Sequence, residues 1–487
     1  MSREKAITLL FLFCFTSSSL WAQNPQQQPP PQKPPAPSDQ TPTPSALAPL
    51  QTRDGIVEPR QHGGLSLFEL ERIATQNNPT LKQAEANVQA ARGRVRQAGL
   101  YPNPTVGYTG DEISPGPIIR GGEHGFFVDQ RIVLGGKLGK NRQVFSQELA
   151  QAEAELQAQR LRVSNSVRQF YYQALAAQRR IEIRRHLAQL ADEAVQTSHG
   201  LYNVGQSDRP DVLESEIEGQ QMRLGLDVAR HEYGRIWRQL TAILGDPDMS
   251  PVPLAGALDD VPALDENAAL REILRASPEL LIVQAGVERG RAAVSAARAA
   301  RIPDLEVRGG LRYNRELLEL GLKPVGWEGF ADVGIQLPIF NRNQGNIAAA
   351  MGELSSAEQE TRRLELSLRA RFGEAFAQYA SARQIAESYK RDLLPRAEES
   401  HRLYQARFGE MTAAYPQVLI ARRNLLKLNE QYVAALESAW EAVVPIQGFL
   451  LGDGFGAPVS FFEPGRAELG RGVELKGLEG GKAPEFE

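Results

Sequence analysis

Between residues 329 and 337, every second residue is apolar or small, and the residues between them are of mixed polarity. One set is Gly329, Ala331, Val333, Ile335 and Leu337, and the other is Phe330, Asp332, Gly334 and Gln336. Successive side chains of a strand point to opposite faces, so this period of two predicts a β-strand. We expect Pro338 to end the strand, because proline has no N–H group to donate to a ladder.

The segment after this strand has a helical pattern about sixty residues long. Its apolar positions recur at steps of three, four or seven, which predicts a helix with one apolar stripe. At 1.5 Å per residue the helix would be roughly 90 Å long. Asn341 and Asn343 are expected to cap its start, because Asn side chains accept hydrogen bonds from the first free N–H groups. The stripe consists of Ile347, Met351, Leu354, Ala357, Leu364, Leu368, Phe372, Ala375, Tyr379, Ala382, Ala386, Tyr389 and Leu393.

The first half of the chain has the same order of patterns. It predicts a helix that is interrupted at a proline, two strands separated by a loop rich in glycine and proline, a very long helix and a return helix. The expected bounds are 67–77 and 79–100 for the interrupted helix, 105–109 and 124–134 for the strands, and 137–199 and 210–244 for the long pair.

Short matches between the two halves recur at a nearly constant offset. Asn78-Pro79 and Ser277-Pro278 are 199 residues apart, and Gly245-Asp246 and Gly452-Asp453 are 207 apart. A repeated period of this kind indicates an internal duplication. We therefore predict a mainly α fold with a small β part. The expected segments are a first repeat over 65–246 (β-hairpin 104–134, helical hairpin 137–245), a connector over 247–265 and a second repeat over 266–453 (β-hairpin 304–340, helical hairpin 342–451).

The two ends of the chain have a different composition. Arg3 and Lys5 precede an apolar run over residues 6–15 and then Leu20-Trp21-Ala22, which is typical of a secretory signal peptide cleaved after Ala22. A buried N-terminal helix is the alternative. Residues 23–64 are rich in Pro and Gln and are expected to be a disordered linker, or else a ligand for a reader of Pro-rich motifs. Residues 454–487 are expected to be an irregular tail.

The predicted strands carry apolar side chains that nothing else in the chain can cover. Two-faced strands also occur in soluble proteins, but each half supplies only two strands and no further sheet is predicted. Exposed strand edges are avoided in proteins, and membrane barrels need at least eight strands, so other chains are expected to complete the sheet. Tyr313, Trp327 and Phe330 lie near the strand ends and are candidates for an interfacial girdle.

Composition excludes several classes of function. The net charge of −4 gives no reason to expect nucleic acid as a partner. The one cysteine, Cys14, lies inside the predicted signal peptide behind the bulky Phe13, so neither lipidation nor a thiol site is expected. No set of nucleophile and base is apparent, and His186 and His199 lack metal-ligand spacing. Gly135-Gly136-Lys137 lacks the spacing of a phosphate loop. We predict that the chain is not an enzyme and has no cofactor or metal site.

The strand-to-helix junctions resemble those of a known family, the TolC-like outer-membrane efflux proteins. The junction of the second half is similar to that of the heavy-metal branch, which serves cobalt–zinc–cadmium exporters. The first-half counterpart, Leu134-Gly135-Gly136-Lys137, is similar as well, and the resemblance covers about residues 65–453. The second junction runs from Leu337 to Asn346 and includes Pro338, Asn341, Arg342, Asn343, Gln344 and Gly345.

The resemblance implies an assembly in the outer membrane of a Gram-negative bacterium. Three chains would share one twelve-stranded β-barrel, with outer-membrane lipid around it. The long helices would form an α-barrel across the periplasm, and the tips of the helical hairpins would meet a periplasmic adaptor and an inner-membrane pump of the RND type. The loops over 111–123 and 315–326 would face the outside of the cell. The Pro/Gln-rich linker is not part of the family pattern, and the anchoring cysteine of some members is absent.

The tip motif of the family is an apolar residue, a glycine, a polar residue and Ser or Thr. It matches Val204, Gly205, Gln206 and Ser207 in the first half, and Phe408, Gly409, Glu410 and Thr412, with Met411 between the last two, in the second. Glycine at these positions allows the left-handed backbone conformation that reverses a helix. Each side chain can equally be part of a plain turn.

These features favour a passive export conduit. The branch suggests divalent heavy-metal cations as cargo, yet no cluster of Cys, Met or His would select them, so we expect the pump to do so. Drugs or organic solutes are the alternative cargo. A structural coiled-coil surface protein would explain the helices but not the paired β-hairpins, and a secreted enzyme would need a catalytic set that is not apparent.

Overall fold

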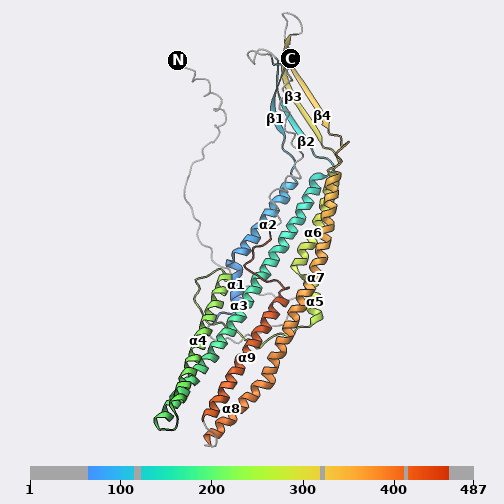
Figure 1. Cartoon of the computed structure of the whole chain (residues 1–487). Coiled ribbons are helices and arrows are strands. Elements are labelled where there is room, and N and C mark those ends of the chain that lie inside the picture. The colour runs from blue at the N-terminus through green and yellow to red at the C-terminus, as the bar shows by residue number, and fades with distance from the viewer. Residues whose placement is uncertain (1–63, 114–121, 318–323, 411–414, 460–487) are drawn as a thin grey trace, which may run out of the picture. The chain divides into compact units, whose positions relative to one another are not determined.

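The computed structural model of the chain describes residues 64–113, 122–317, 324–410 and 415–459. Two halves follow the same order of elements, namely two shorter helices, a β-hairpin and a pair of long helices (Figure 1). The first half comprises α1 (Leu67–Asn77), α2 (Pro79–Ala98), β1 (Thr105–Asp111), β2 (Glu123–Ile132), α3 (Lys137–Asn203) and α4 (Arg209–Leu244). The second comprises α5 (Glu266–Ala276), α6 (Pro278–Ala299), β3 (Leu305–Leu317), β4 (Pro324–Ile335), α7 (Gln344–Ser388), a π-helical segment (Tyr389–Leu393), α8 (Leu394–Gly409) and α9 (Tyr415–Gln447). The predicted mainly α fold with a small β part and an internal repeat is confirmed.

Several predicted features lie outside the described residues. These are the signal peptide with its cleavage after Ala22, the linker up to residue 63, the centres of the two hairpin loops (114–121 and 318–323), Thr412 and the tail from residue 460.

The four strands form one antiparallel sheet in the order β1-β2-β3-β4 (Figure 1). The β-hairpins of the two halves are joined through β2 and β3, whose register pairs His124 with Tyr313 and Ile132 with Leu305. Strand β4 ends at Ile335, opposite the first residue of β3, so the strand that was predicted to run to Leu337 and stop at Pro338 was two residues too long. Leu337 has no ladder partner because β3 does not extend that far.

Helix α3 is the longest element, with 67 residues, which corresponds to roughly 100 Å. It packs against α2 and α6 and also against α4 and α9. Near its start Glu153 pairs with Arg92 of α2 at 3.0 Å, and further along Arg184 donates to Glu430 of α9 at 2.8 Å. One continuous helix therefore contacts both the elements next to the sheet and the second helical hairpin. None of the described helices is both long and apolar enough to span a bilayer.

The predicted sixty-residue helix of the second half contains a π-helical segment. Residues 389–393 form it, and α8 begins immediately afterwards with Pro395 in its first turn. Proline cannot donate the backbone hydrogen bond of a regular helix and clashes with the preceding turn, which accounts for the wider π turn just before it. The apolar stripe alone gave no sign of this change.

Aromatic side chains with polar tips hold the connector between α4 and α5. The Tyr379 hydroxyl donates to the Pro262 carbonyl at 2.8 Å and accepts the Leu264 N–H at 2.9 Å, and Trp440 Nε1 donates to the Leu258 carbonyl at 2.9 Å. Buried polar groups need such partners, so the connector is fixed onto the long helices rather than loose.

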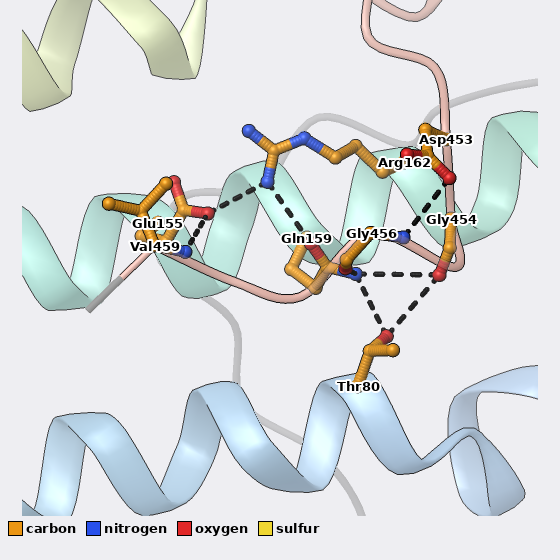
Figure 2. Close-up of polar contacts among 8 residues, drawn as sticks. All are labelled: Thr80, Glu155, Gln159, Arg162, Asp453, Gly454, Gly456 and Val459. Carbon is orange, nitrogen blue, oxygen red and sulfur yellow. Dashed lines mark hydrogen bonds and ion pairs between the residues drawn. The ribbon is translucent and has the colours of Figure 1, made fainter.

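The segment after α9 is bound along α3 (Figure 2). The fully buried Gln159 donates through Nε2 to Thr80 Oγ1 at 2.8 Å and to the Gly456 carbonyl at 3.1 Å. The carboxylate of Glu155 accepts the Val459 N–H at 3.0 Å and Arg162 Nη1 at 2.8 Å. The beginning of the predicted irregular tail thus has no regular secondary structure, yet it is part of the packed molecule.

Candidate functional site

One face of the sheet is apolar and exposed. Alternation and register place Tyr108, Phe126 and Leu311 side by side across β1, β2 and β3 on this face. Trp327 and Val333 of β4 are 70% and 69% exposed. A contiguous exposed apolar surface of this kind marks contact with lipid or with another protein. Its exposed large members are Val106, Tyr108, Phe126, Val128, Ile132, Leu311, Trp327, Val333 and Ile335.

Of the three aromatic residues predicted to form an interfacial girdle, two lie together on the apolar face. Tyr313 and Trp327 are paired in the register and lie edge to face, 5.5 Å apart, at one end of the apolar face. Phe330 points to the opposite face, because it is an odd number of residues from Trp327. Its ring lies over Gly310, where an added Cβ would come within 2.8 Å of a ring carbon.

The other face of the sheet is charged. The Arg312 guanidinium lies 2.5 Å from the carboxylate of Glu123, 3.3 Å from that of Glu328 and 4.0 Å from that of Asp111. Among the side chains that the structure describes, this face bears six carboxylates and three guanidiniums, which makes this set net negative. Its charged members are Asp111, Glu123, Asp129, Arg131, Glu306, Arg308, Arg312, Glu328 and Asp332.

The sheet is open at both sides. Within the described residues, β1 pairs only with β2 and β4 only with β3, so each outer strand presents a row of unpaired N–H and C=O groups. The sheet can therefore accept a further strand at each edge.

The two strand-to-helix junctions share one backbone conformation. Gly136 before α3 has φ 64° and ψ 22°, and Asn343 before α7 has φ 59° and ψ 22°. These values belong to the left-handed region, which glycine adopts freely and asparagine tolerates better than most residues. The duplication thus preserved the turn with two different residues.

In the first junction, Lys137 binds Asp304 of the second half. Lys137 Nζ lies 2.6 Å from Asp304 Oδ1, and the same carboxyl group accepts the Leu134 N–H at 3.1 Å and Arg131 Nε at 2.9 Å. Partial burial raises the pKa of Asp304, but the three donors outweigh it, so the pKa lies below its ordinary value. Asp304 thereby ties the two halves together where the sheet meets the helices.

In the second junction, the predicted caps act differently from expectation. Asn343 is the N-cap residue of α7, but its side chain makes no capping hydrogen bond, because its Oδ1 accepts from Asn346 Nδ2 at 2.6 Å. Its Nδ2 donates to the Ala297 carbonyl at 2.8 Å. Asn341 does not cap the helix either, since its Oδ1 accepts the Asn343 N–H at 3.0 Å. The Gln344 side chain accepts the Arg342 N–H at 2.8 Å.

The remaining junction residues shape the surface around these bonds. Gly135 lies against Ile302, whose side chain a Cβ there would meet at 2.7 Å. Gly345 follows in the first turn of α7 with open space around it. Pro338 and Arg342 line a hollow together with residues from the end of α6 and the turn after it.

The first tip ends α3 with a complete Schellman motif. The Gly205 N–H donates to the Tyr202 carbonyl at 3.0 Å and the Gln206 N–H donates to the Leu201 carbonyl at 2.9 Å, while Gly205 has φ +76°. The left-handed conformation predicted for Gly205 is therefore present. Val204 is 67% exposed and Gln206 is also exposed, so both are available to a partner.

The Ser207 side chain forms a hydrogen bond within the tip. Its hydroxyl donates to Asp211 Oδ2 at 2.8 Å, and the Asp208 N–H donates to the same oxygen at 3.2 Å. The Ser207 hydroxyl and then the Asp208 N–H hold the pKa of Asp211 below its ordinary value. Ser207 thus helps to start α4.

The second tip is described only up to residue 410. Gly409 is the last residue of α8 and is helical, so the left-handed turn expected at this glycine is wrong. The helix continues because the Glu410 N–H still donates to the Ala406 carbonyl at 3.1 Å. Phe408 is half-exposed at 44%.

Sequence reasoning missed Asp304 and the hollow beside Arg342. Lys137 and Arg131, which bind Asp304, are 167 or more residues away from it in the sequence. Arg298 and Arg342, which line the hollow, are about forty residues apart. No local pattern therefore shows either feature. The only available signal for Asp304 was an acidic residue among basic ones directly before a strand. No group of His, Cys, Asp and Glu that could hold a metal ion occurs in the described part of the chain.

This arrangement, an open sheet with one apolar and one charged face above long paired helices, defines a membrane-associated channel component. The sequence model of the outer membrane efflux protein family matches residues 70–246 and 269–450, once for each half. The chain belongs to this family of outer-membrane efflux channels, which are not enzymes.

Individual relatives agree with the family. The chain is 25% identical over 395 residues to the cobalt-zinc-cadmium resistance protein CzcC of Cupriavidus metallidurans, covering 81% of this chain and 92% of that protein. The structure of CusC has a TM-score of 0.65 at 18% identity, covering 84% of this chain and 100% of that chain. The outer membrane protein VceC of Vibrio cholerae has a TM-score of 0.64 at 19% identity, covering 79% and 96%. The structural similarity at this level of identity shows the fold.

Proposed function

We propose that three copies of this chain form the outer-membrane conduit of a tripartite efflux system for divalent heavy-metal cations. The observation that carries the proposal is the open four-stranded sheet with an exposed apolar face and a charged face. Three such sheets joined through β1 and β4 would give twelve strands, which is enough to close a barrel with lipid outside and water inside. Closure would also remove both unpaired edges.

The helical hairpins are proposed to continue the conduit through the periplasm. Their tips would dock a periplasmic adaptor and an inner-membrane pump of the RND type. The exposed Val204 and Gln206 at the first tip support this role, because their side chains are not used within the turn. At the second tip Phe408 and Glu410 are the corresponding described candidates.

The proposed cargo rests on similarity and on charge. The relative CzcC is named for cobalt, zinc and cadmium resistance. The described side chains of the charged face include six carboxylates and three guanidiniums, an excess of negative charge that favours cations in the barrel interior. Drugs or organic solutes remain the alternative cargo.

We also propose the processing and repeat boundaries given by the sequence. The signal peptide would end at Ala22, the linker would run to about residue 64, and the repeats would span 65–246 and 266–453.

A resistance assay tests the proposed cargo. In a host that retains the matching pump and adaptor but lacks this chain, sensitivity to cobalt, zinc and cadmium salts should rise, and expression of the chain should restore resistance. Resistance to a set of organic antibiotics is measured in parallel and compared with resistance to the metal salts. Restored resistance to the antibiotics with unchanged metal sensitivity would replace metal cations by organic solutes as the cargo.

A further inference from the structure

Three arginines line one hollow at the junction of the sheet and the helices. The hollow, of about 430 Å³, is open to the surface, and its wall consists of Arg298, Arg301, Ile302, Pro338 and Arg342. Arg298 lies in the last turn of α6, and Arg342 lies just before α7. The fold therefore brings together guanidiniums from two segments that are about forty residues apart in the sequence.

The three arginines of the hollow form no ion pair among residues 64–113, 122–317, 324–410 and 415–459. Arg342 Nε donates to the Ile339 carbonyl at 3.3 Å, which is a neutral partner. The nearby carboxylate of Asp304 is occupied by Lys137 and Arg131. Like charges that share a hollow repel one another, and a bound anion would relieve that repulsion.

The other segments that join the sheet to the helices are basic in sequence, but most of their charges are paired. Residues 89–104 contain no acidic residue, yet Arg92 and Arg94 pair with Glu153 and Glu148 of α3. Residues 130–147 contain no acidic residue either, yet Arg131 and Lys137 pair with Asp304. The hollow differs from both segments because none of its three arginines forms an ion pair among the described residues.

Exposed apolar side chains adjoin the hollow. Leu337, Ile339 and Phe340, on either side of Pro338, are 65%, 60% and 91% exposed, and Ile302 in its wall is 45% exposed. They follow Ile335, the last residue of β4 and a member of the apolar face. A free phosphate ion would gain nothing from contact with these apolar side chains, whereas a lipid presents a phosphate and acyl chains together.

We propose that the hollow binds the phosphate of an anionic phospholipid headgroup. The guanidiniums of Arg298, Arg301 and Arg342 would hold the phosphate oxygens, since the planar fork of arginine matches that geometry. Leu337, Ile339 and Phe340 would lie at the start of the acyl region, and the hollow would lie among the headgroups of the leaflet on the side of the helices. The inference rests on the proposed placement of the sheet across the outer membrane.

Lipid binding to the purified full-length protein in detergent tests the proposal. The measured quantity is the retention of phosphatidylglycerol compared with phosphatidylcholine, read by native mass spectrometry. The wild-type protein should prefer phosphatidylglycerol. A basic side chain near an anionic lipid surface is worth roughly fivefold in affinity, so R298Q/R301Q/R342Q should lose on the order of a hundredfold in phosphatidylglycerol binding.

A matched variant separates the hollow from net charge. R289Q/R362Q/R369Q removes the same charge from arginines of α6 and α7 that do not line the hollow, and it should bind like the wild type. R298K/R301K/R342K keeps the charge and should retain a preference for phosphatidylglycerol, even if the Gln variant fails to fold.

Three results would overturn the proposal. They are a wild-type protein with no preference between the two lipids, equal losses in the hollow variant and the matched variant, and displacement of the lipid by glycerol phosphate at equal concentration, which would indicate a site for free phosphate. The assay uses purified protein and no export, so the lipid site and the efflux role can fail independently.

Discussion

Asp304 is the residue on which the contact between the two strand-to-helix junctions depends. Replacing Asp304 by Asn removes the charge that Lys137 and Arg131 bind, and hydrogen bonds to a charged group are worth about 2 kcal/mol each. We expect D304N to lower the thermal stability of the purified protein at pH 7, measured by circular dichroism in detergent. D248N, at an exposed position, is the control.

The pH dependence of the same variant has a defined sign. The folded-state pKa of Asp304 is lowered, so its contribution is present above the ordinary carboxyl pKa of 3.8 and is lost as the pH falls through the folded value. Between pH 7 and pH 3 the wild-type protein should lose more stability than D304N does. Parallel acid profiles for the two proteins would show that the carboxylate is not ionised and bound as described.

The tip residues allow docking to be separated from folding. Gln206 is exposed and its side chain has no role in the turn, so Gln206→Arg should leave assembly intact while reducing cross-linking to the adaptor and metal resistance in cells. Glu410→Arg is the equivalent change at the second tip. If resistance stays normal in both variants at equal protein level, these tips are not the docking surface.

For Ser207 we expect a loss of stability rather than a loss of docking. Because its hydroxyl binds Asp211 at the start of α4, Ser207→Ala should cost about 1 kcal/mol of stability, measured by thermal unfolding, with little change in adaptor cross-linking. A large docking defect without a loss of stability would assign Ser207 to the partner contact instead.

At the residue scale, local chemistry was predictable and long-range contacts were not. Gly205 has the predicted left-handed conformation, which glycine adopts without strain, whereas Gly409 in the matching motif is the last residue of α8. Asn343 has the backbone of a cap, but its Oδ1 accepts from the nearby Asn346 side chain and its Nδ2 donates to the carbonyl of Ala297, 46 residues away. The sequence contains no local signal for the contact with Ala297.

At the scale of elements, the alternation of the strands makes a prediction about the membrane. Val333 lies on the apolar face and Asp332 on the charged face. In outer membranes, Val333→Cys should be protected from a water-soluble maleimide, because lipid would cover it, whereas Asp332→Cys should react. The only natural cysteine is Cys14, so the background is low. Equal labelling of the two positions would contradict a membrane-spanning β4.

The same alternation explains how well the elements could be predicted. A period of two needs only neighbouring residues, so both ends of β2 and the end of β4 were predicted within two residues, whereas the predicted start at Gly329 was five residues after the first residue of β4. The end of β4 depends on its partner strand, and the π-helical turn depends on how a single proline is accommodated within a long helix. Neither is a property of the apolar pattern.

At the scale of the whole molecule, the unpaired outer strands predict the stoichiometry. The purified protein should have three times the mass of one processed chain in detergent, measured by native mass spectrometry. Deleting β1 (Thr105–Asp111) should prevent this assembly, because one edge of each sheet would be lost. A stable monomer or dimer of the intact chain would rule out closure by three copies.

The two long helical paths differ in their mechanical properties. Helix α3 runs from the sheet to the tip without a proline, so a load applied at the tip reaches the sheet through an unbroken series of regular turns. The α7–α8 path contains the wider turn at Tyr389–Leu393 and Pro395 just beyond it, which makes it locally more compliant. An equal load on both tips would therefore deform the α7–α8 path more than α3, so the two halves of the duplicated chain would respond differently to the same force.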